Sequence, residues 1–332
     1  MTEQKFTQYN DLAAERLGGK TLLCTDDFFA EMENLLKPGR GIFITDKFTE
    51  RGKWMDGWES RRKRVPGHDW CIIQLATPGK IHGVDIDTNY FLGNHPPHAS
   101  IEACNLPAQA KEADFEAANW TEILVKSPLQ PGSQNLYEIT DETIYTHLKL
   151  HIYPDGGVAR LKVYGEVYKD WTIVGAEELV DVAAAVNGAK SVQCNDMFFS
   201  HMDNLITPGR GVNMGDGWET KRNRTPGNKD WVIVRLAHKA SIKKILVDTC
   251  HFKGNYPDTC LIEGCTISPD DEANLATDQI EWMTILPQVK LQADHEHYFE
   301  TEIATNEAFT HARLTIFPDG GISRMRLWGT LK

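Results

Sequence analysis

The sequence predicts a mainly β protein made of two tandem jelly-roll β-sandwiches with short helices. Three observations predict this fold class: an internal repeat along the chain, short stretches in which apolar and polar residues alternate, and turn residues between those stretches. Each copy of the repeat has roughly 150 residues, enough to bury a core of its own. Roughly eight short strands in a copy of that length are typical of a β-sandwich or jelly roll.

The repeat defines the domains. Residues 11–41 match residues 181–211 at 16 of 31 positions. DGWESRRKRVPG at 56–67 recurs as DGWETKRNRTPG at 216–227, and PDGGVARLKVYG at 154–165 recurs as PDGGISRMRLWG at 318–329. A repeat this long indicates a duplicated domain. We therefore predict domains over residues 8–165 and 178–329, joined by a short linker at 166–177.

Alternation with a period of two residues predicts the strands. In copy 1, WCIIQLA (70–76) and IHGVDID (81–87) should be two strands around a turn at Pro78-Gly79. Further strands are expected at SIEAC, WTEILV, NLYEI, HLKLHIY and ARLKVYG, and copy 2 repeats them. Short helices are expected at 11–17, 181–186 and 27–36. In the last of these, Phe28, Met32, Leu35 and Leu36 share one helical face.

The net charge and the cysteine content of the chain indicate which kinds of binding partner and compartment to expect. The net charge of −12 and the pI near 5.5 argue against a nucleic acid or an anionic membrane. A small anionic substrate stays compatible, because local arginines can outweigh the overall field. Seven cysteines without framework spacing favour free thiols in a reducing cytosol. The polar N-terminus has no signal-peptide pattern, and no apolar run reaches the ~20 residues that span a bilayer.

Three loop motifs are kept in both copies. They are PGRG, with Arg40 and Arg210; DGWE followed by R-x-R, with Asp56, Glu59, Arg64 and with Asp216, Glu219, Arg224; and PDGG followed by an arginine, Arg160 or Arg324. The DGWE loop places two carboxylates beside guanidinium groups, which grip a ligand's carboxylate through paired hydrogen bonds. The alternative is structural: Asp56 caps a turn, Trp58 packs, and the charges pair with one another. For PDGG, turn geometry and a buried salt bridge are the alternative.

Asparagines and histidines give weaker signals. Asn94 and Asn255 occupy matching F-x-G-N loops at strand ends, and each bonds either a ligand or its own turn. His295 and His297, in copy 2, have the spacing of a metal-binding pair, and His95 and His98, in copy 1, are a second possibility. Neither pair is repeated in the other copy. We interpret them as surface histidines and expect no metal site. No Walker loop, HExxH, paired CxxC or G-x-S-x-G motif occurs.

Taken together, the motifs DDFF…PGRG, DGWE(S/T)xRxR.PG, DTxxFxGN and PDGG(V/I)xR resemble the allantoicase family over nearly the whole chain, duplication included. The resemblance implies two galactose-binding-like jelly-roll sandwiches and an enzyme that converts allantoate and water into ureidoglycolate and urea. It also implies a homo-oligomer, with a hexamer as one candidate.

The reaction itself suggests roles for the repeated residues. Replacing a ureido group by water needs an acid for the leaving nitrogen, a base for water and a cation for the carboxylate. We expect Glu59 or Glu219, with Asp56 or Asp216, to share the acid and base steps. Arg64 or Arg224, with Arg40 or Arg210, would hold the carboxylate. The chemistry requires no metal, and a divalent ion stays compatible with it.

Two other hypotheses stay open from the sequence. One is a non-catalytic sandwich that binds a sugar or another small molecule, because fold alone does not select a function. The other is a chain with one catalytic unit and one structural unit. The full motif set in both copies argues against simple decay of one of them.

Overall fold

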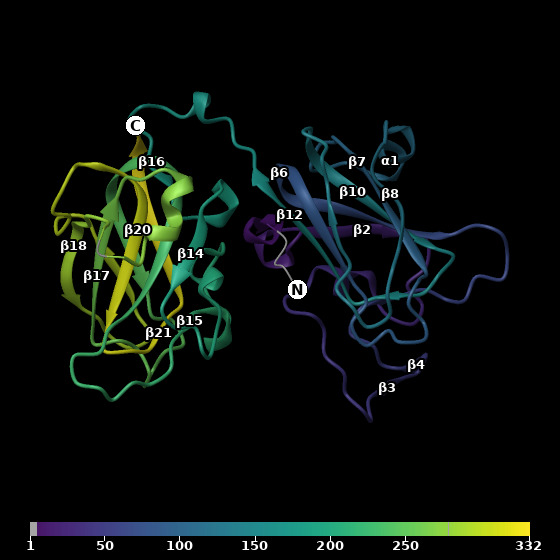
Figure 1. Ribbon diagram of the computed structural model, residues 1–332, viewed down its shortest axis with the longest axis horizontal. Coiled ribbons are helices and arrows are strands. Elements are labelled where there is room, and N and C mark those ends of the chain that lie inside the picture. Colours follow the sequence, from purple (N-terminus) through teal and green to yellow (C-terminus); the bar gives the residue numbers. More distant parts are fainter. Residues whose placement is uncertain (1–4, 278) are drawn as a thin grey trace. The chain divides into compact units, whose positions relative to one another are not determined.

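The structure is a computed structural model that describes residues 5–277 and 279–332. The chain divides after Tyr168 into two compact units, which share one strand order. In Figure 1, unit 1 runs from purple to teal and unit 2 from teal to yellow. The expected mainly β fold of two tandem sandwiches with short helices is confirmed.

The strands of unit 1 are β1 (Asn10–Asp11), β2 (Lys20–Cys24), β3 (Phe48–Thr49), β4 (Gly52–Lys53), β5 (Trp58–Glu59), β6 (Asp69–Asp87), β7 (His98–Cys104), β8 (Thr121–Pro128), β9 (Leu136–Glu138), β10 (Ile144–Tyr153), β11 (Gly157–Val158) and β12 (Arg160–Val167). Its helices are the 3₁₀ turns η1 (Lys5–Gln8), η2 (Glu15–Leu17) and η3 (Met32–Leu36), and α1 (Glu112–Ala117).

The strands of unit 2 are β13 (Val180–Asp181), β14 (Lys190–Cys194), β15 (Trp218–Glu219), β16 (Asp230–Asp248), β17 (Thr259–Cys265), β18 (Met283–Lys290), β19 (Glu296–Phe299), β20 (Ala308–Phe317), β21 (Gly321–Ile322) and β22 (Arg324–Leu331). Its helices are the 3₁₀ turns η4 (Trp171–Ile173), η5 (Ala185–Asn187), η6 (Met202–Ile206), η7 (Met214–Asp216) and η8 (Pro269–Asn274).

The long strand β6 joins the two layers of unit 1. Its first half pairs with β2 and β10, and its second half pairs with β12 and β9. A straight strand of this length would span about 60 Å. However, Ile152 of β10 pairs with Asp69, and Arg160 of β12 pairs with Asp87. Ile152 and Arg160 are eight residues apart in the sequence, so at most about 29 Å separates them. The strand therefore doubles back, and both of its ends lie at one end of the sandwich.

The expected turn at Pro78-Gly79 is thus wrong in one respect. The chain bends there from one layer to the other without leaving the strand, because β10 and β12 continue the hydrogen-bonded ladder across the bend. A β-carbon on Gly79 would lie 2.5 Å from the carbonyl oxygen of Glu166, so in unit 1 this position of the bend has no room for a side chain. In unit 2, β16 bends in the same way between β20 and β22.

Alternating side chains of the strands fill the space between the layers, as the period of two predicts. In β10, Leu148, Leu150 and Ile152 are fully buried, and in β12, Leu161 and Val163 meet them from the facing layer. Such a core makes the sandwich rigid, so its end loops can be positioned accurately.

The predicted helices are shorter than expected. Asp11 and Asp181 belong to edge strands, and only the three-residue turns η2 and η5 follow them. In the segment 27–36 only η3 is helical. The preceding residues are extended because Ala30 forms an isolated β-bridge with Glu59. Phe28 consequently lies outside the core, whereas Leu35 and Leu36 are buried as predicted.

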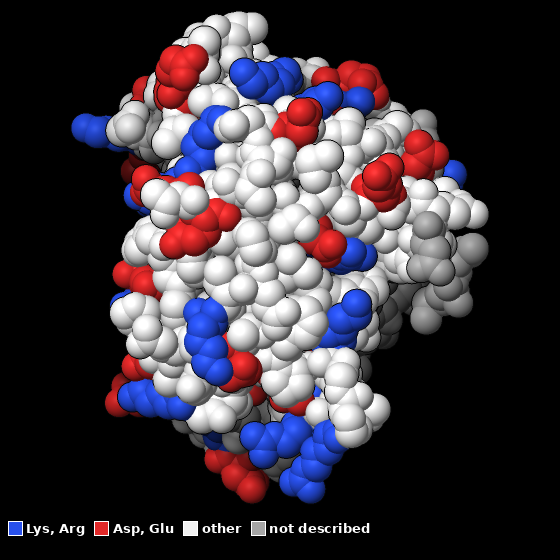
Figure 2. Space-filling view, turned by 90° about the vertical axis from the view of Figure 1, so that its left-hand side faces the viewer, with Lys and Arg blue, Asp and Glu red and all other residues white. Residues whose placement is uncertain are grey.

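The surface carries charges of both signs. On the face shown in Figure 2, acidic and basic side chains are interspersed around an uncharged middle, so no single-sign patch covers this face. Within the described residues, no helix is long and apolar enough to cross a membrane. All seven cysteines are free thiols.

Candidate functional site

The loops that are repeated in both units meet, in each unit, at the end of the sandwich where the long strand begins and ends. The tryptophan of DGWE anchors this region. Trp58 is fully buried and its indole nitrogen donates to the carbonyl oxygen of Asp26 at 2.9 Å. Trp218 donates to the carbonyl oxygen of Asp196 at 2.8 Å. Each anchor fixes the direction of the glutamate that follows it.

That glutamate pairs with the asparagine of the F-x-G-N loop. The amide Nδ2 of Asn94 donates to Oε1 of Glu59 at 2.7 Å, and Asn255 makes the same contact with Glu219. The side-chain amide of each asparagine therefore bonds the acidic residue of another loop rather than its own turn. Burial raises the pKa of both glutamates above the ordinary value, and the asparagine hydrogen bond opposes that rise.

The Glu59–Asn94 pair of unit 1 lies in the wall of a cavity of about 350 Å³. Aromatic and aliphatic side chains form most of this wall, namely Phe29, Phe43, Met55, Tyr90 and Leu92, and the ammonium-bearing side chain of Lys53 also lines it. Apolar walls with a few convergent polar groups are typical of sites for small molecules. The cavity thus presents one carboxyl group, one amide and one cation to a ligand.

The aspartate of DGWE has a different environment. Oδ2 of Asp56 accepts hydrogen bonds from Arg160 at 2.8 Å and from the backbone nitrogen of Ile42 at 2.8 Å. Nη1 of Arg160 also donates to the Asp56 carbonyl oxygen at 3.0 Å. In unit 2, Asp216 and Arg324 form the same ion pair. These carboxylates and guanidinium groups hold the loop and are occupied by one another.

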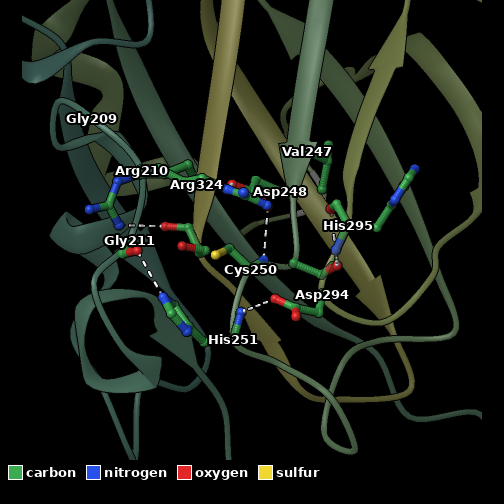
Figure 3. Close-up of polar contacts among 12 residues, drawn as sticks. Gly209, Arg210, Gly211, Val247, Asp248, Cys250, His251, Asp294, His295 and Arg324 are labelled. Atoms are coloured by element: carbon green, nitrogen blue, oxygen red, sulfur yellow. Dashed lines mark hydrogen bonds and ion pairs between the residues drawn. The ribbon is translucent and has the colours of Figure 1, made fainter.

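The arginine of PGRG also pairs within its unit. Arg40 donates to both carboxylate oxygens of the buried Asp87, at 2.7 and 3.0 Å. Arg210 reaches Asp248 at 3.0 and 3.5 Å (Figure 3). The rest of each guanidinium is half exposed, with 43% and 51% of the side chain accessible. The aspartate therefore occupies the Nε–Nη2 edge of each guanidinium, and the rest of the side chain lies at the partly exposed loop surface.

The position after the long strand has an unusual backbone in both units. Tyr90 and His251 have φ angles of 66° and 69°, a region that non-glycine residues rarely adopt and that is frequent at functional sites. Figure 3 shows His251 beside the PGRG loop, where Nε2 lies 2.9 Å from the carbonyl oxygen of Gly211. Its backbone nitrogen donates to Asp294. Tyr90 instead lines the unit 1 cavity.

The R-x-R segments extend from the end loops into solvent. Arg64 and Arg224 are exposed. Their loops are held through the backbone, where the nitrogen of Lys63 donates to Asp155 and that of Asn223 donates to Asp319. In unit 2 this segment borders a cavity of about 680 Å³, lined by Arg222, Arg224, Asn255 and neighbouring loop residues. Arg64 does not line the cavity that contains Glu59 in the described part of the chain.

The PDGG loop supports the asparagine. The nitrogen of Gly157 donates to the carbonyl oxygen of Asn94 at 2.8 Å. Gly156 has a φ of +137°, and a β-carbon there would lie 2.6 Å from the same carbonyl oxygen. The two glycines are therefore required for the close approach of two loops. Unit 2 repeats this contact at Gly320 and Gly321.

One histidine expectation is wrong. His297 is buried rather than on the surface: its Nδ1 bonds the carbonyl oxygen of Val247 at 3.0 Å, and its Nε2 accepts from the nitrogen of Gln292 at 2.8 Å. Both ring nitrogens are thus occupied by the backbone, whereas His295 is exposed. Within residues 5–277 and 279–332 no group of three or more His, Cys, Asp or Glu side chains could hold a metal ion.

Three side chains of the unit 1 cavity, Phe43, Lys53 and Tyr90, are not repeated in unit 2, so the repeat did not predict them. Phe43 and Lys53 lie in a segment with no counterpart in unit 2, and the residue of unit 2 that is equivalent to Tyr90 is His251. The signal was a change of offset. Gly41 matches Gly211 at an offset of 170, whereas Asp56 matches Asp216 at 160, so copy 1 contains ten extra residues beside the site.

Comparisons with known proteins show which family both units match. Residues 10–168 and 180–332 each match the allantoicase repeat. A probable allantoicase from Pseudomonas fluorescens (strain SBW25) is 49% identical over 324 residues, which cover 98% of this chain and 97% of that protein. A probable allantoicase 1 from Burkholderia mallei (strain ATCC 23344) is 50% identical over 328 residues, which cover 98% and 96%.

A solved structure has the same fold over almost the same length. The crystal structure of allantoicase from Saccharomyces cerevisiae superposes with a TM-score of 0.81 at 37% identity, and the match covers 96% of this chain and 92% of that one. The similarity therefore includes both units.

Proposed function

The chain belongs to the allantoicase family, and we propose that it hydrolyses allantoate to ureidoglycolate and urea, with Glu59 as the acid and base of the reaction. One observation carries this assignment to Glu59. Its carboxyl group is the acidic group that lines the unit 1 cavity, and Asn94 holds it there at 2.7 Å. Asp56, the other acidic candidate of that loop, is occupied by Arg160 and by the backbone of Ile42.

The environment of Glu59 suits a proton donor. Because burial raises its pKa, a larger fraction is protonated near neutral pH than for a carboxyl in water. The protonated carboxyl donates to the ureido nitrogen as the bond between that nitrogen and the central carbon breaks, and urea leaves. The resulting carboxylate then accepts a proton from the water that bonds to the same carbon. Direct displacement and trapping of an imine by water both use these two proton transfers.

Asn94 positions this group. Its Nδ2 donates to one carboxyl oxygen of Glu59, which leaves the other oxygen for the substrate. The backbone carbonyl oxygen of Asn94 accepts a hydrogen bond from Gly157 of the PDGG loop. A donor held in this way loses little entropy when the substrate arrives. We assign Asn94 a positioning role for the reacting carboxyl, and Asp56, Arg160, Arg40 and Asp87 a supporting role for the loops.

The central experiment measures urea. The purified full chain is incubated with allantoate, and urea and ureidoglycolate are quantified; equal amounts of both are expected. Glu59→Gln should lower kcat by about 10²- to 10⁴-fold, the usual contribution of a general acid or base. Absence of urea from the wild-type chain would contradict the activity, and near-normal turnover by the variant would contradict the assignment.

We propose that no metal is required, since carboxyl chemistry supplies both proton transfers. Dialysis against a chelator should therefore leave the rate unchanged. Loss of activity that Mn²⁺ or Ca²⁺ restores would contradict this proposal.

We also propose that the enzyme acts in allantoin and purine degradation as a homo-oligomer in the cytoplasm, with a hexamer as the first candidate. Seven free thiols fit a reducing compartment. Exposed phenyl rings on unit 2, at Phe198 and Phe199, are of the kind that subunit interfaces cover. Light scattering during size-exclusion chromatography gives the mass, and a monomer mass would refute the oligomer.

A further inference from the structure

The ten extra residues of copy 1 form a hairpin at the edge of the unit 1 cavity. Fourteen residues, 42–55, connect Gly41 to Asp56, whereas four residues, 212–215, connect Gly211 to Asp216. Strands β3 and β4 pair within this insertion, which extends from unit 1 in Figure 1. The neighbouring loops match between the units, so the hairpin is the main difference between the two sites.

The hairpin is attached to unit 1 by specific contacts. Nη1 of Arg51 donates to the carbonyl oxygen of Phe28 at 3.1 Å, and its guanidinium lies 5.2 Å from the Phe28 ring. Phe43 stacks on Tyr90 with ring centroids 5.5 Å apart. Met55, at the end of the insertion, is buried against Phe91 and Ala159. These contacts hold the hairpin against the mouth of the cavity.

A comparison of the two units shows how much the hairpin covers. The paired phenylalanines that follow the strand end are 37% and 36% exposed in unit 1, at Phe28 and Phe29. Their counterparts Phe198 and Phe199 are 65% and 61% exposed. The hairpin contributes to this difference through Arg51, which lies over the ring of Phe28, and Arg61 outside the hairpin lies over the same ring. The hairpin turns an open loop surface into a walled cavity.

The hairpin also places a cation in that cavity. Lys53 lines it together with Glu59 and Asn94, and its ammonium lies 4.9 Å from the ring of Phe43 and 4.6 Å from that of Phe48. The ammonium donates one proton to the carbonyl oxygen of Thr45, and its other N–H groups remain for a ligand. Unit 2 has no residue at this position, because the four-residue connection omits it. Of the unit 1 arginines expected to bind the carboxylate, Arg40 pairs with Asp87 and Arg64 does not line this cavity.

We propose that the hairpin completes the substrate site of unit 1 through Phe43, Lys53 and Met55, and that Lys53 binds the carboxylate of the ureide substrate. This inference rests on the proposed function. The ammonium holds the carboxylate at one side of the cavity while Glu59 faces the leaving ureido group, and Phe43 and Tyr90 exclude water. A loop of the unit 2 type lacks the wall and the cation, and does not support the reaction.

A substitution at Lys53 tests the cation directly. Lys53→Met keeps most of the apolar stem and removes the charge, so KM for allantoate should rise about 10- to 100-fold, the usual effect of losing a charge-assisted hydrogen bond. The value of kcat should change less than about threefold, because the carboxylate is bound equally in the ground and transition states. Lys53→Arg should restore KM to within a few fold.

The hairpin supplies a matched control. Lys47 belongs to the same hairpin, and its ammonium lies 3.8 Å from the ring of Trp54, but it does not line the cavity. Lys47→Met should leave both kcat and KM at their wild-type values. A rise of KM in both lysine variants would assign the effect to the general charge of the hairpin and overturn the specific role of Lys53.

A substrate analogue gives a readout that a structural role would not move. The carboxamide of allantoate lacks the negative charge, so the wild-type chain should strongly prefer the carboxylate. In Lys53→Met this preference should fall by the same factor as the rise in KM. An unchanged preference would overturn the proposal, whatever the stability of the variant.

A chimaera tests the hairpin as a whole. Residues 42–55 are replaced by residues 212–215, a connection that the same loops already accommodate in unit 2. We expect a loss of at least 100-fold in kcat/KM with an unchanged β-sheet spectrum. Wild-type kinetics in the chimaera would overturn the inference while the proposed function stands, whereas a wild-type chain that releases no urea would fail the proposed function itself.

Discussion

The buried ion pair between Asp56 and Arg160 distinguishes a supporting residue from a catalytic one. Its side chains are 11% and 3% exposed, and the two groups share bonds to the loop backbone. Asp56→Asn keeps the shape and removes the charge, so the guanidinium of Arg160 stays buried without a counter-ion. Breaking such a pair typically costs about 3 to 5 kcal/mol of unfolding free energy.

The double variant shows whether the cost comes from the pair. Arg160→Met should also cost about 3 to 5 kcal/mol. Combined with Asp56→Asn, the total should be about 2 kcal/mol less than the sum, because residues in contact couple by up to roughly that amount. In unit 2, Asp216 is 24% exposed, so Asp216→Asn should cost less than Asp56→Asn.

Urea-induced unfolding of the full chain, followed by fluorescence and circular dichroism, gives these free energies, and urea release from allantoate gives kcat. Additive costs would refute the ion-pair argument. An Asp56→Asn variant with wild-type stability and a kcat more than 100-fold lower would refute it more directly, because Asp56 would then act on the substrate.

Three further predictions follow from the carboxyl groups. Glu59→Gln and Glu219→Gln should have unequal effects on kcat, with the larger loss at Glu59, because it lines the walled cavity; equal losses would contradict a difference between the units. Asn94→Ala removes the hydrogen bond that lowers the pKa of Glu59, so the pH at which kcat falls as the pH rises should be higher in the variant. If the pH profile of kcat shows that this pH is unchanged or lower, Glu59 is not the acid. Burial raises the pKa of Asp85 to about 6, and its Oδ1 has no partner, although Gln134 donates to Oδ2 at 2.7 Å. Because the folded pKa exceeds the unfolded value, stability should fall by about 3 kcal/mol as pH rises from about 4 to above 6; Asp85→Asn should remove that fall, which unfolding at pH 4 and pH 7 in both proteins measures.

Local patterns were sufficient for most of the strands and for the loops that surround the site. Alternation in HLKLHIY and ARLKVYG identified β10 and β12, because one face of each strand is buried in the sandwich. The helical pattern of 27–36 failed at its start. There, Ala30 is held by Glu59 from the other side of the loop, and tertiary pairing outweighs a weak local preference.

The roles of the polar residues could not be read from their spacing. Glu59 and Asp56 are three residues apart and equally repeated, yet one faces a cavity and the other an arginine 104 residues away. Similarly, Asn94 had two candidate partners in the sequence, and its actual partner is 35 residues away. His297 has the spacing of a metal ligand, but the backbone occupies both of its ring nitrogens.

The duplication, the β-sandwich class, the loops that carry the site and the family could be predicted from local periodicity and from motifs kept in order. Tertiary contacts were needed to show which carboxyl is available to a ligand, which arginines are already paired and where Lys53 lies. They were needed because β6 doubles back and brings distant loops together at one end of the sandwich. Burial and pairing there, rather than residue type, fix the chemistry of each side chain.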